Sequence, residues 1–267
     1  MIPESNQPAK LYATAKTHKF DNLKDINSNN LKFRPIIDQT GTFTYNASKV
    51  IADYLKPLSN NKYTIQDTQQ FPEMITSLPS LLNDEEYVSY DVDSLFTNVP
   101  FTDTIDYILH QIYHEKKLKP ICSKTVFKRI LLKLTTDCTF TLNGKFYKQT
   151  DGCSMGGPLS VIISNIWLNK AESDVVTPQA PEFYKRYVDD IFTKRKKNVP
   201  DVLFQNLNSH HPNIKLTIEQ NPSKFLDTKL TVTRDKVITS VNRKSTKLPI
   251  HWSSSVPKRY KRNMIKG

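Results

Sequence analysis

Apolar residues recur every three to four positions in several stretches of the chain, and this spacing predicts amphipathic helices. We expect helices over 48–58, 102–118 and 159–170, and a further helix that begins after Ser123 as its N-cap. The predicted apolar faces of the first helix and of the helix after Ser123 are Val50, Ile51, Tyr54 and Leu55, and Val126, Ile130, Leu131 and Leu134, respectively. Pro158 precedes the 159–170 helix, where its missing N–H costs no hydrogen bond.

Short β-rich segments lie between these helices. The segment 87–91 predicts a strand that ends at a carboxylate, and three hairpins are expected over 140–147, 183–194 and 225–241. The first hairpin carries Asn143-Gly144, a strong turn signal. Because helices and hairpins are mixed without a βαβ alternation, the pattern predicts an α+β fold with an antiparallel sheet covered by helices on one face.

Composition narrows the class of protein. The 267 residues suffice for one large or two small domains, and 13 Phe and 12 Tyr provide core material although only 37% of residues are hydrophobic. No apolar run reaches the roughly 18 residues of a membrane span, and the polar start lacks a signal peptide. Cys122, Cys138 and Cys153 have no CxxC spacing, which argues against a disulfide framework or a cysteine zinc site. We expect an intracellular protein of the nucleus or cytoplasm, neither secreted nor membrane-bound.

Positive charge is concentrated at the C-terminal end. Lys and Arg number 38 against 26 Asp and Glu, a net charge of +12, and residues 236–267 hold nine Lys and Arg without one acid. Such a segment suits a polyanion, through contacts with phosphates and release of counterions. The alternative is a solvated basic tail, or a localisation signal around 258–262.

Three carboxylates are candidates for catalysis. Asp91 ends the predicted strand, and Asp189 and Asp190 lie between the apolar arms of the second hairpin. If they converge, they repel one another unless a cation compensates. Oxygen ligands suit Mg²⁺, and two such ions about 3.5–4 Å apart can drive phosphoryl transfer. The alternative is ordinary turn chemistry for the acid pair and a helix-capping role for Asp91.

A glycine-rich segment, 149–160, accompanies these acids. It contains Gly152, Gly156 and Gly157, half of the chain's six glycines. Glycine permits close approach of the backbone to another backbone, a base or a sugar, although a sharp loop into a helix would explain it equally well. Arg34, fixed before Pro35, could pair with a triphosphate through its planar fork or form a structural salt bridge.

The ordered set of these motifs resembles the reverse transcriptases. In their individual residues the motifs more closely resemble those of Penelope-like retroelements, which are relatives of telomerase. The resemblance extends from about residue 10 to 260. The matching pieces are Leu11-Tyr12, Lys16-Thr17-His18-Lys19, Arg34-Pro35-Ile36, Ser89-Tyr90-Asp91-Val92, Asp151-Gly152-Cys153-Ser154-Met155-Gly156, Tyr187-Val188-Asp189-Asp190 and Phe225-Leu226-Asp227. Departures are Ala13-Thr14-Ala15, where a glycine-containing stretch is expected, and Asp38, where a small residue is commoner.

The resemblance implies roles for individual residues. Two Mg²⁺ ions, with Mn²⁺ as a possible substitute, would be held by Asp91, Asp189, Asp190 and the carbonyl of Val92. Phe96 would exclude a ribose 2′-hydroxyl. The remaining implied roles are nucleotide binding for Arg34 and Lys16, lining of the nucleotide and template pocket for Gln149 and Gly152, a primer-side hairpin at Phe225-Leu226-Asp227 and a general acid for Lys215.

The resemblance also implies an organisation and partners. We expect a right-hand polymerase with fingers in 1–86 and 104–148, a palm in 87–235, and the start of a largely missing thumb in 236–267. The partners would be an RNA template, a DNA primer and deoxynucleoside triphosphates, with no membrane. Two alternatives stay open: a truncated, catalytically silent relic that binds nucleic acid, and a two-metal nuclease, against which Phe96 and Arg34 argue.

Other polar and aromatic residues receive plainer interpretations. A metal site at His110 and His114 is disfavoured because no acidic third ligand lies at zinc spacing. Asp93 is interpreted as a turn or helix acid, and the basic run 194–197 either contacts template phosphates or is solvated. Trp167 and Trp252 are expected to pack, and Cys153 is not expected to be a nucleophile.

Overall fold

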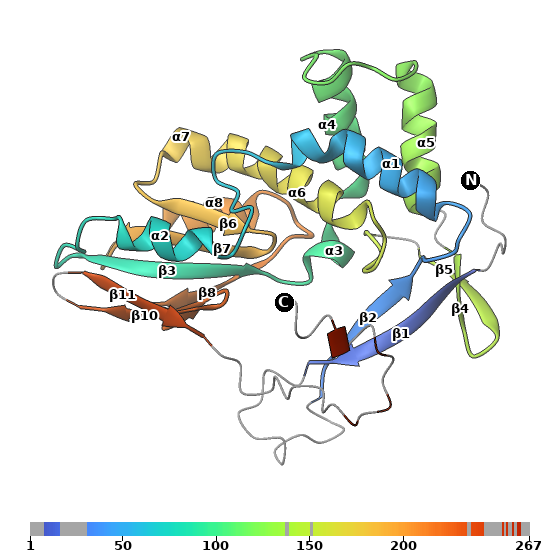
Figure 1. Cartoon of the computed structure of the whole chain (residues 1–267). Coiled ribbons are helices and arrows are strands. Elements are labelled where there is room, and N and C mark those ends of the chain that lie inside the picture. Colours follow the sequence, from blue (N-terminus) through green and yellow to red (C-terminus); the bar gives the residue numbers. More distant parts are fainter. Residues whose placement is uncertain are drawn as a thin grey trace.

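The computed structural model describes residues 8–16, 31–136, 139–149, 152–233 and 236–242, with isolated positions between 253 and 262 (Figure 1). The basic segment beyond 242 and Trp252 therefore lie largely or wholly outside the described residues. Among the described residues, no helix is long and apolar enough to cross a membrane.

The helices confirm the periodicity, with differences at their ends. Their bounds are α1 Tyr45–Leu55, η3 Lys56–Ser59, α2 Gln70–Thr76, α3 Leu95–Asn98, α4 Phe101–Tyr113, α5 Lys124–Thr136, α6 Ser160–Ala171, η4 Glu172–Val176, α7 Thr177–Gln179 and α8 Val202–Ser209. Helix α4 ends before the predicted 118. Helices α2 and α8 were not predicted, because seven and eight residues hold too few turns for a clear period.

In each of two predicted apolar faces, one residue is wrong. Val50 is 66% exposed and Val126 is 45% exposed, whereas Ala52 and Phe127 are buried. Each helix is therefore rotated slightly about its axis from the predicted orientation. Several adjacent apolar positions could have formed the buried stripe, and tertiary packing decides which of them face the core.

The strands form three sheets. Their bounds are β1 Ala9–Ala15, β2 Phe33–Asp38, β3 Glu85–Val92, β4 Thr139–Leu142, β5 Lys145–Lys148, β6 Tyr184–Tyr187, β7 Asp190–Lys196, β8 Leu216–Gln220, β9 Lys224–Phe225, β10 Thr228–Val232 and β11 Val237–Val241. The orders are β2-β1-β4-β5 (the N-terminal sheet), β6-β7-β3-β8 (the central sheet) and β11-β10-β9. All three predicted hairpins are present. Asn143 and Gly144 both have positive φ, the conformation of a type I′ hairpin turn.

The central sheet is antiparallel and its longer helices cover one face, in agreement with the α+β prediction, while the short helix α2 packs on the other. Because strand side chains alternate, Val88, Tyr90 and Val92 of β3 point to the same face, where they pack in one core with α1, α4, α5 and α6. Figure 1 shows α1, α4 and α6 on one side of β3 and the β10–β11 hairpin on the other.

Among the described residues, the opposite face of the central sheet is covered at one end only. Tyr87 and Phe192 pack there with Phe71 of α2 and Phe225 of β9, with ring centroids 4.7–5.3 Å apart. Toward the other end of β3 this face becomes accessible, and Asp91 is exposed. The aromatic cluster thus anchors the sheet and leaves its acidic end open.

Candidate active site

The three predicted carboxylates lie together at the open end of the central sheet. Asp91 of β3 pairs with Asp190 of β7 in the antiparallel register, so both side chains leave the same face, away from the helices. Asp189 lies in the two-residue turn between Tyr187 and Asp190. Its carbonyl accepts a hydrogen bond from the amide of Val92 at 3.2 Å, which ties the turn to the end of β3.

Positive charge from the N-terminal strands reaches this turn. Burial raises the pKa of Asp189, and it outweighs the lowering by the residue's own backbone amide, by Arg34 and by Lys16. The two cations thus act on Asp189 across a long sequence separation. A nucleotide site formed by these cations and acids stays a prediction.

The N-terminal hairpin explains how these cations are positioned. Strands β1 and β2 pair antiparallel with Thr14 opposite Arg34. At the end of the hairpin, the amide of Lys16 donates to the carbonyl of Lys32 at 2.8 Å. Lys16 and Arg34 therefore lie on adjoining strands near one end of the N-terminal sheet.

The glycine-rich segment connects that hairpin to the central sheet. On the central side, a Cβ on Gly152 would lie 2.3 Å from the carbonyl oxygen of Thr97, and the amide of Cys153 donates to the carbonyl of Phe96 at 2.6 Å. Gly152 also has a φ of +66°, which L-residues rarely adopt. The backbone after the Asp91 strand is therefore packed directly on this loop.

On the other side the same loop contacts β2. A Cβ on Gly156 would lie 2.6 Å from the carbonyl oxygen of Ile37, and the Ile37 amide donates to the carbonyl of Met155 at 2.7 Å. The Gln39 side-chain amide donates to Ser154 Oγ at 2.7 Å. At Gly152 and Gly156 the backbone of the loop therefore comes close to the backbone of other protein segments, which is one of the close contacts that the sequence analysis considered for these glycines.

The remaining predicted site residues surround the acids. Phe96 is partly buried in α3, the short helix that follows β3. Gln149 is partly buried just after β5. Lys215 has an exposed side chain, and its carbonyl accepts from the amide of Asp93 at 2.8 Å, so it lies beside the acidic end of β3.

The donor set is suited to a hard divalent cation. Its side-chain donors are carboxylate oxygens, with backbone carbonyls nearby, and oxygen is the ligand that Mg²⁺ prefers. Among the described residues, no three His, Cys, Asp or Glu side chains are grouped closely enough to hold an ion by themselves. Mg²⁺ is usually bound by only one or two carboxylates together with water and substrate phosphates, so the Asp91 end of the sheet fits this partial cage.

The first three residues of the basic run 194–197 belong to β7 rather than to a loop. Lys194 pairs with Glu85 at 3.1 Å and Arg195 pairs with Glu86 at 2.8 Å, both acids of β3. Lys197 donates to the carbonyl of Asn83. The sequence could not indicate the pairs with β3, because Glu85 and Glu86 lie more than a hundred residues from their partners; contact of the run with template phosphates stays a prediction.

The structure places the remaining residues that it describes as follows. His110 and His114 stack on each other, with ring centroids 5.1 Å apart. Asp93 lies in the turn before α3, and Trp167 is buried in the core. Burial raises the pKa of the Cys153 thiol to about 12, which leaves it unreactive at neutral pH.

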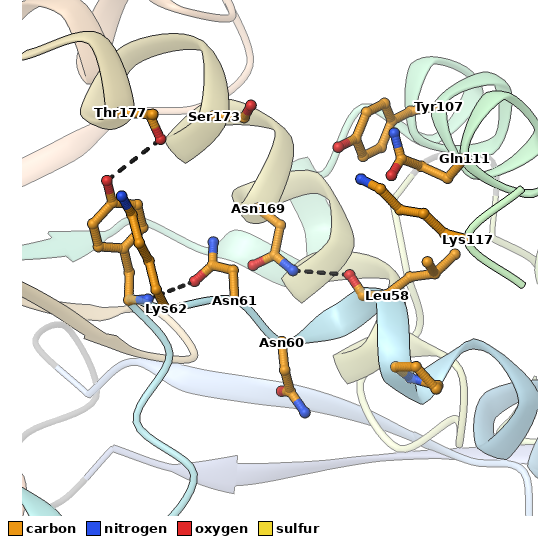
Figure 2. A pocket seen from close by; sticks show the side chains of 12 residues that line it. Leu58, Asn60, Asn61, Lys62, Tyr107, Gln111, Lys117, Asn169, Ser173 and Thr177 are labelled. Carbon is orange, nitrogen blue, oxygen red and sulfur yellow. Dashed lines mark hydrogen bonds between the residues drawn. The ribbon is translucent and has the colours of Figure 1, made fainter. Parts of the chain in front are cut away.

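A polar cavity of about 240 Å³ lies on the helix side of the central sheet. Figure 2 shows Asn61, Asn169 and Lys62 on its walls, with Tyr107, Gln111 and Lys117 at the far side. The Asn169 side-chain amide donates to the carbonyl of Leu58 at 2.8 Å. The sequence analysis did not single out this cavity, since its lining residues come from segments with no shared motif.

Comparison with known proteins places the chain among polymerases. Residues 24–248 match the family model for reverse transcriptase (RNA-dependent DNA polymerase). Similar solved structures include telomerase from Candida albicans in complex with a fragment of telomeric RNA (TM-score 0.61, 10% identity, 88% of this chain and 47% of that one). Two structures of apo telomerase from Candida tropicalis are also similar: one (TM-score 0.58, 13% identity) covers 91% of this chain and 49% of that one, and the other, truncated from the C-terminal domain (0.56, 12%), covers 90% and 56%.

These likenesses concern the fold. The chain spans about half of the length of the telomerase chains that it matches. No curated protein sequence matches it significantly.

Proposed function

Because the chain belongs to the reverse transcriptase family, we propose that it is an RNA-directed DNA polymerase domain that extends a DNA primer along an RNA template. The observation that carries this proposal is the convergence of Asp91, Asp189 and Asp190 at one end of the central sheet, with Arg34 and Lys16 close enough to act on Asp189. Acids that bind metal and cations that bind phosphate must face each other for nucleotidyl transfer.

Two Mg²⁺ ions, or Mn²⁺ in their place, would supply Lewis-acid activation of the primer hydroxyl and stabilise the leaving pyrophosphate. We assign Asp91, Asp189, Asp190 and the carbonyl of Val92 to hold them. The oxygen donors at the sheet end, of which Asp91 is exposed and Asp189 and Asp190 are partly buried, support this assignment.

The other residues have roles in binding and selection. Arg34 binds the triphosphate through its planar fork, and Lys16 adds a second positive charge. Phe96 lies directly after the Asp91 strand, where a bulky ring excludes a ribose 2′-hydroxyl. The backbone of Lys215 lies beside the acidic end of β3, and we assign its side chain the role of general acid, which donates a proton to the leaving group. Gln149 and Gly152 line the nucleotide and template side.

The sheets suggest how the polymerase regions are divided. We assign residues 1–86 and 104–148 to the fingers, the rest of 87–235, with the central sheet, to the palm, and the basic segment from 236 to the start of a thumb. The structure of telomerase bound to an RNA fragment supports RNA as a partner.

Within the family, we propose a Penelope-like retroelement origin. The motifs that support this origin are Leu11-Tyr12, Ser89-Tyr90-Asp91-Val92 and Phe225-Leu226-Asp227. In a tree built from residues 24–248, the chain should group with Penelope-like sequences; grouping with telomerases or group II intron enzymes would overturn this subtype.

The test is primer extension on an RNA template with Mg²⁺ and the four deoxynucleotides. The wild type is compared with Asp189→Asn and with Asp93→Asn, a neighbouring exposed acid that bonds Ser94 in the turn. Extension by the wild type and Asp93→Asn, but a loss of roughly 100-fold or more in Asp189→Asn, would support the proposal.

Other outcomes distinguish the alternatives. Salt-sensitive binding of nucleic acid with no extension by any variant would favour the catalytically silent binding module. Cleavage of nucleic acid without added nucleotides would favour the two-metal nuclease. Phe96→Ala adds a separate check, because a polymerase should then incorporate ribonucleotides more readily.

A further inference from the structure

A buried arginine lies on β6 just before the two-residue turn of Val188 and Asp189. Arg186 of β6 is 0% exposed, and its side chain shares the helix-facing side of the sheet with Tyr184. A buried guanidinium is costly unless its charge is paired and its donors are satisfied. The partners of Arg186 therefore indicate what the residue is for.

All five N–H donors of this guanidinium have acceptors. Nε and Nη2 donate to the carboxylate of Glu172 at 2.6 and 3.2 Å, and Nη1 and Nη2 donate to the amide oxygens of Asn165 and Asn169 at 2.9 and 2.8 Å. The fifth bond runs from Nη1 to the carbonyl of Val188 at 3.2 Å. This last partner belongs to the turn that carries Asp189.

The turn needs such support. Val188 has a φ of +54°, a left-handed conformation that is unfavourable for a β-branched residue. Unfavourable backbone conformations persist only where the surroundings hold them in place. Here the hydrogen bond from Arg186 fixes the Val188 peptide, and the amide of Val92 holds the next carbonyl, that of Asp189.

The arginine is itself anchored in a rigid frame. Glu172 begins η4, a π-helical segment that continues α6, and it also accepts bonds from Tyr184 and from the Asn61 side chain. Asn61 and Asn169 lie on the wall of the polar cavity (Figure 2), where Asn169 is fixed by the Leu58 carbonyl. Short π-helical segments often occur at functional sites.

We propose that Arg186 is a positioning residue, which holds the Val188 peptide so that Asp189 is presented to the metal and nucleotide in the productive orientation. Arg186 does not touch the reacting groups, because it lies on the helix-facing side of the sheet. The inference rests on the proposed function for its consequence in catalysis. Its structural part, the restraint of the turn, can be tested without any catalysis.

The principal variant is Arg186→Lys, which keeps the positive charge beside Glu172 but lacks the fork needed to reach all five acceptors. The matched control is Arg195→Lys on β7, because Arg195 also forms ion pairs, with Glu86 and Asp201, but lies far along the strand from the turn. Thermal unfolding of both variants checks that they fold.

The first readout is amide hydrogen exchange at Val92 and Asp190, which reports on the turn directly. We expect exchange at least tenfold faster in Arg186→Lys and unchanged in Arg195→Lys. The second readout is Mn²⁺ binding, expected to weaken at least fivefold. The third is primer extension, expected to show a kcat at least tenfold lower with an unchanged Kd for primer–template.

The outcomes separate this inference from the proposed function. Equal exchange in the two variants would overturn the positioning role. A wild type that neither binds Mn²⁺ nor extends primers would overturn the proposed function, while the exchange data would still decide the role of Arg186. If Arg186→Lys does not fold, the double variant Arg186→Met with Glu172→Met removes both charges of the buried pair and also removes the hydrogen bond to Val188. It should show the same faster exchange at Val92 and Asp190. Exchange as slow as in the wild type would contradict the inference.

Discussion

Asp91 and Asp190 are cross-strand partners at the open end of the central sheet. Two carboxylates directly opposite each other repel, and a divalent cation bound between them would relieve this repulsion. The fold therefore maintains an acidic end that a divalent ion would stabilise.

The first prediction follows from this pair. Mg²⁺ at ten times its Kd should stabilise the wild type by about 1.4 kcal/mol, which corresponds to a rise in Tm of about 3–5 °C. Asp91→Asn should lose this response, and Asp93→Asn should keep it. The measurement is thermal unfolding with and without Mg²⁺, and an equal response in all three proteins would exclude this end of the sheet as the metal site.

The second prediction concerns pH. The pKa of Asp189 is raised, chiefly by burial, so its contribution to the free energy of unfolding is largest below its unfolded pKa and is lost as pH rises through the folded pKa. Without metal, the Tm of Asp189→Asn should equal that of the wild type near pH 3 and exceed it by up to a few degrees near pH 7.

Glu85 provides the opposite sign as a control. Its pKa is lowered by the backbone amide of Leu82 and by Lys194, so its stabilisation is present at neutral pH and is lost as pH falls through the lowered folded pKa. The Tm of Glu85→Gln should therefore fall further below that of the wild type as pH rises from 3 to 7. Parallel trends for the two variants would contradict both assignments.

The third prediction concerns the nucleotide. Arg34→Ala should raise the KM for deoxynucleotides roughly tenfold, because a charge-assisted hydrogen bond to phosphate is worth about 1.5–3 kcal/mol. Lys10→Ala, on the adjoining strand but at the other end of the hairpin opposite Asp38, is the control and should leave KM unchanged. Steady-state incorporation measures both, and equal effects would indicate a general loss of positive charge.

The fourth prediction uses two glycines of similar φ. Gly152→Ala must accommodate both a φ of +66° and a Cβ 2.3 Å from the Thr97 carbonyl, whereas Gly144, with a φ of +75°, has nothing within 4 Å of its Cβ position. Gly144→Ala should cost about 1 kcal/mol, and Gly152→Ala at least about 2 kcal/mol more through overpacking. Denaturant unfolding gives both values, and similar losses would show that the loop is not packed on the Phe96 segment.

The fifth prediction concerns the strained turn. Val188→Gly should leave the free energy of unfolding unchanged or raise it by up to about 1 kcal/mol, because glycine adopts positive φ without steric cost. The control is Val199→Gly at an exposed position outside the left-handed region, which should cost about 0.5–1 kcal/mol through the greater entropy of the unfolded chain. Because Val188→Gly also removes side-chain contacts with the main core, the decisive comparison is Val188→Ala, which removes the same contacts but keeps a Cβ at positive φ: a loss in Val188→Gly larger than that in Val188→Ala would mean that the turn carries no strain.

The sequence by itself determined the local elements and the candidate acids. The helices after Thr44, Pro100, Ser123 and Leu159 follow from apolar spacing, and the Asn143-Gly144 turn follows from two residues that tolerate positive φ. These signals are readable because the interactions that they report lie within a few residues. The order of the motifs likewise indicated the polymerase family that the family match supports.

Tertiary structure decided which of these residues meet. Only the folded chain brings the charge of Arg34 within electrostatic range of Asp189 and pairs Lys194 and Arg195 with acids of β3. The fold also places Gly152 against the backbone carbonyl of Thr97. It also surrounds Arg186 with five acceptor atoms from α6, η4 and the turn after β6, and an arginine within a strand gives no local sign of this role. A local hydrophobic period specifies which face of an element is buried but not which distant segment will cover it, because that choice depends on packing the whole core at once.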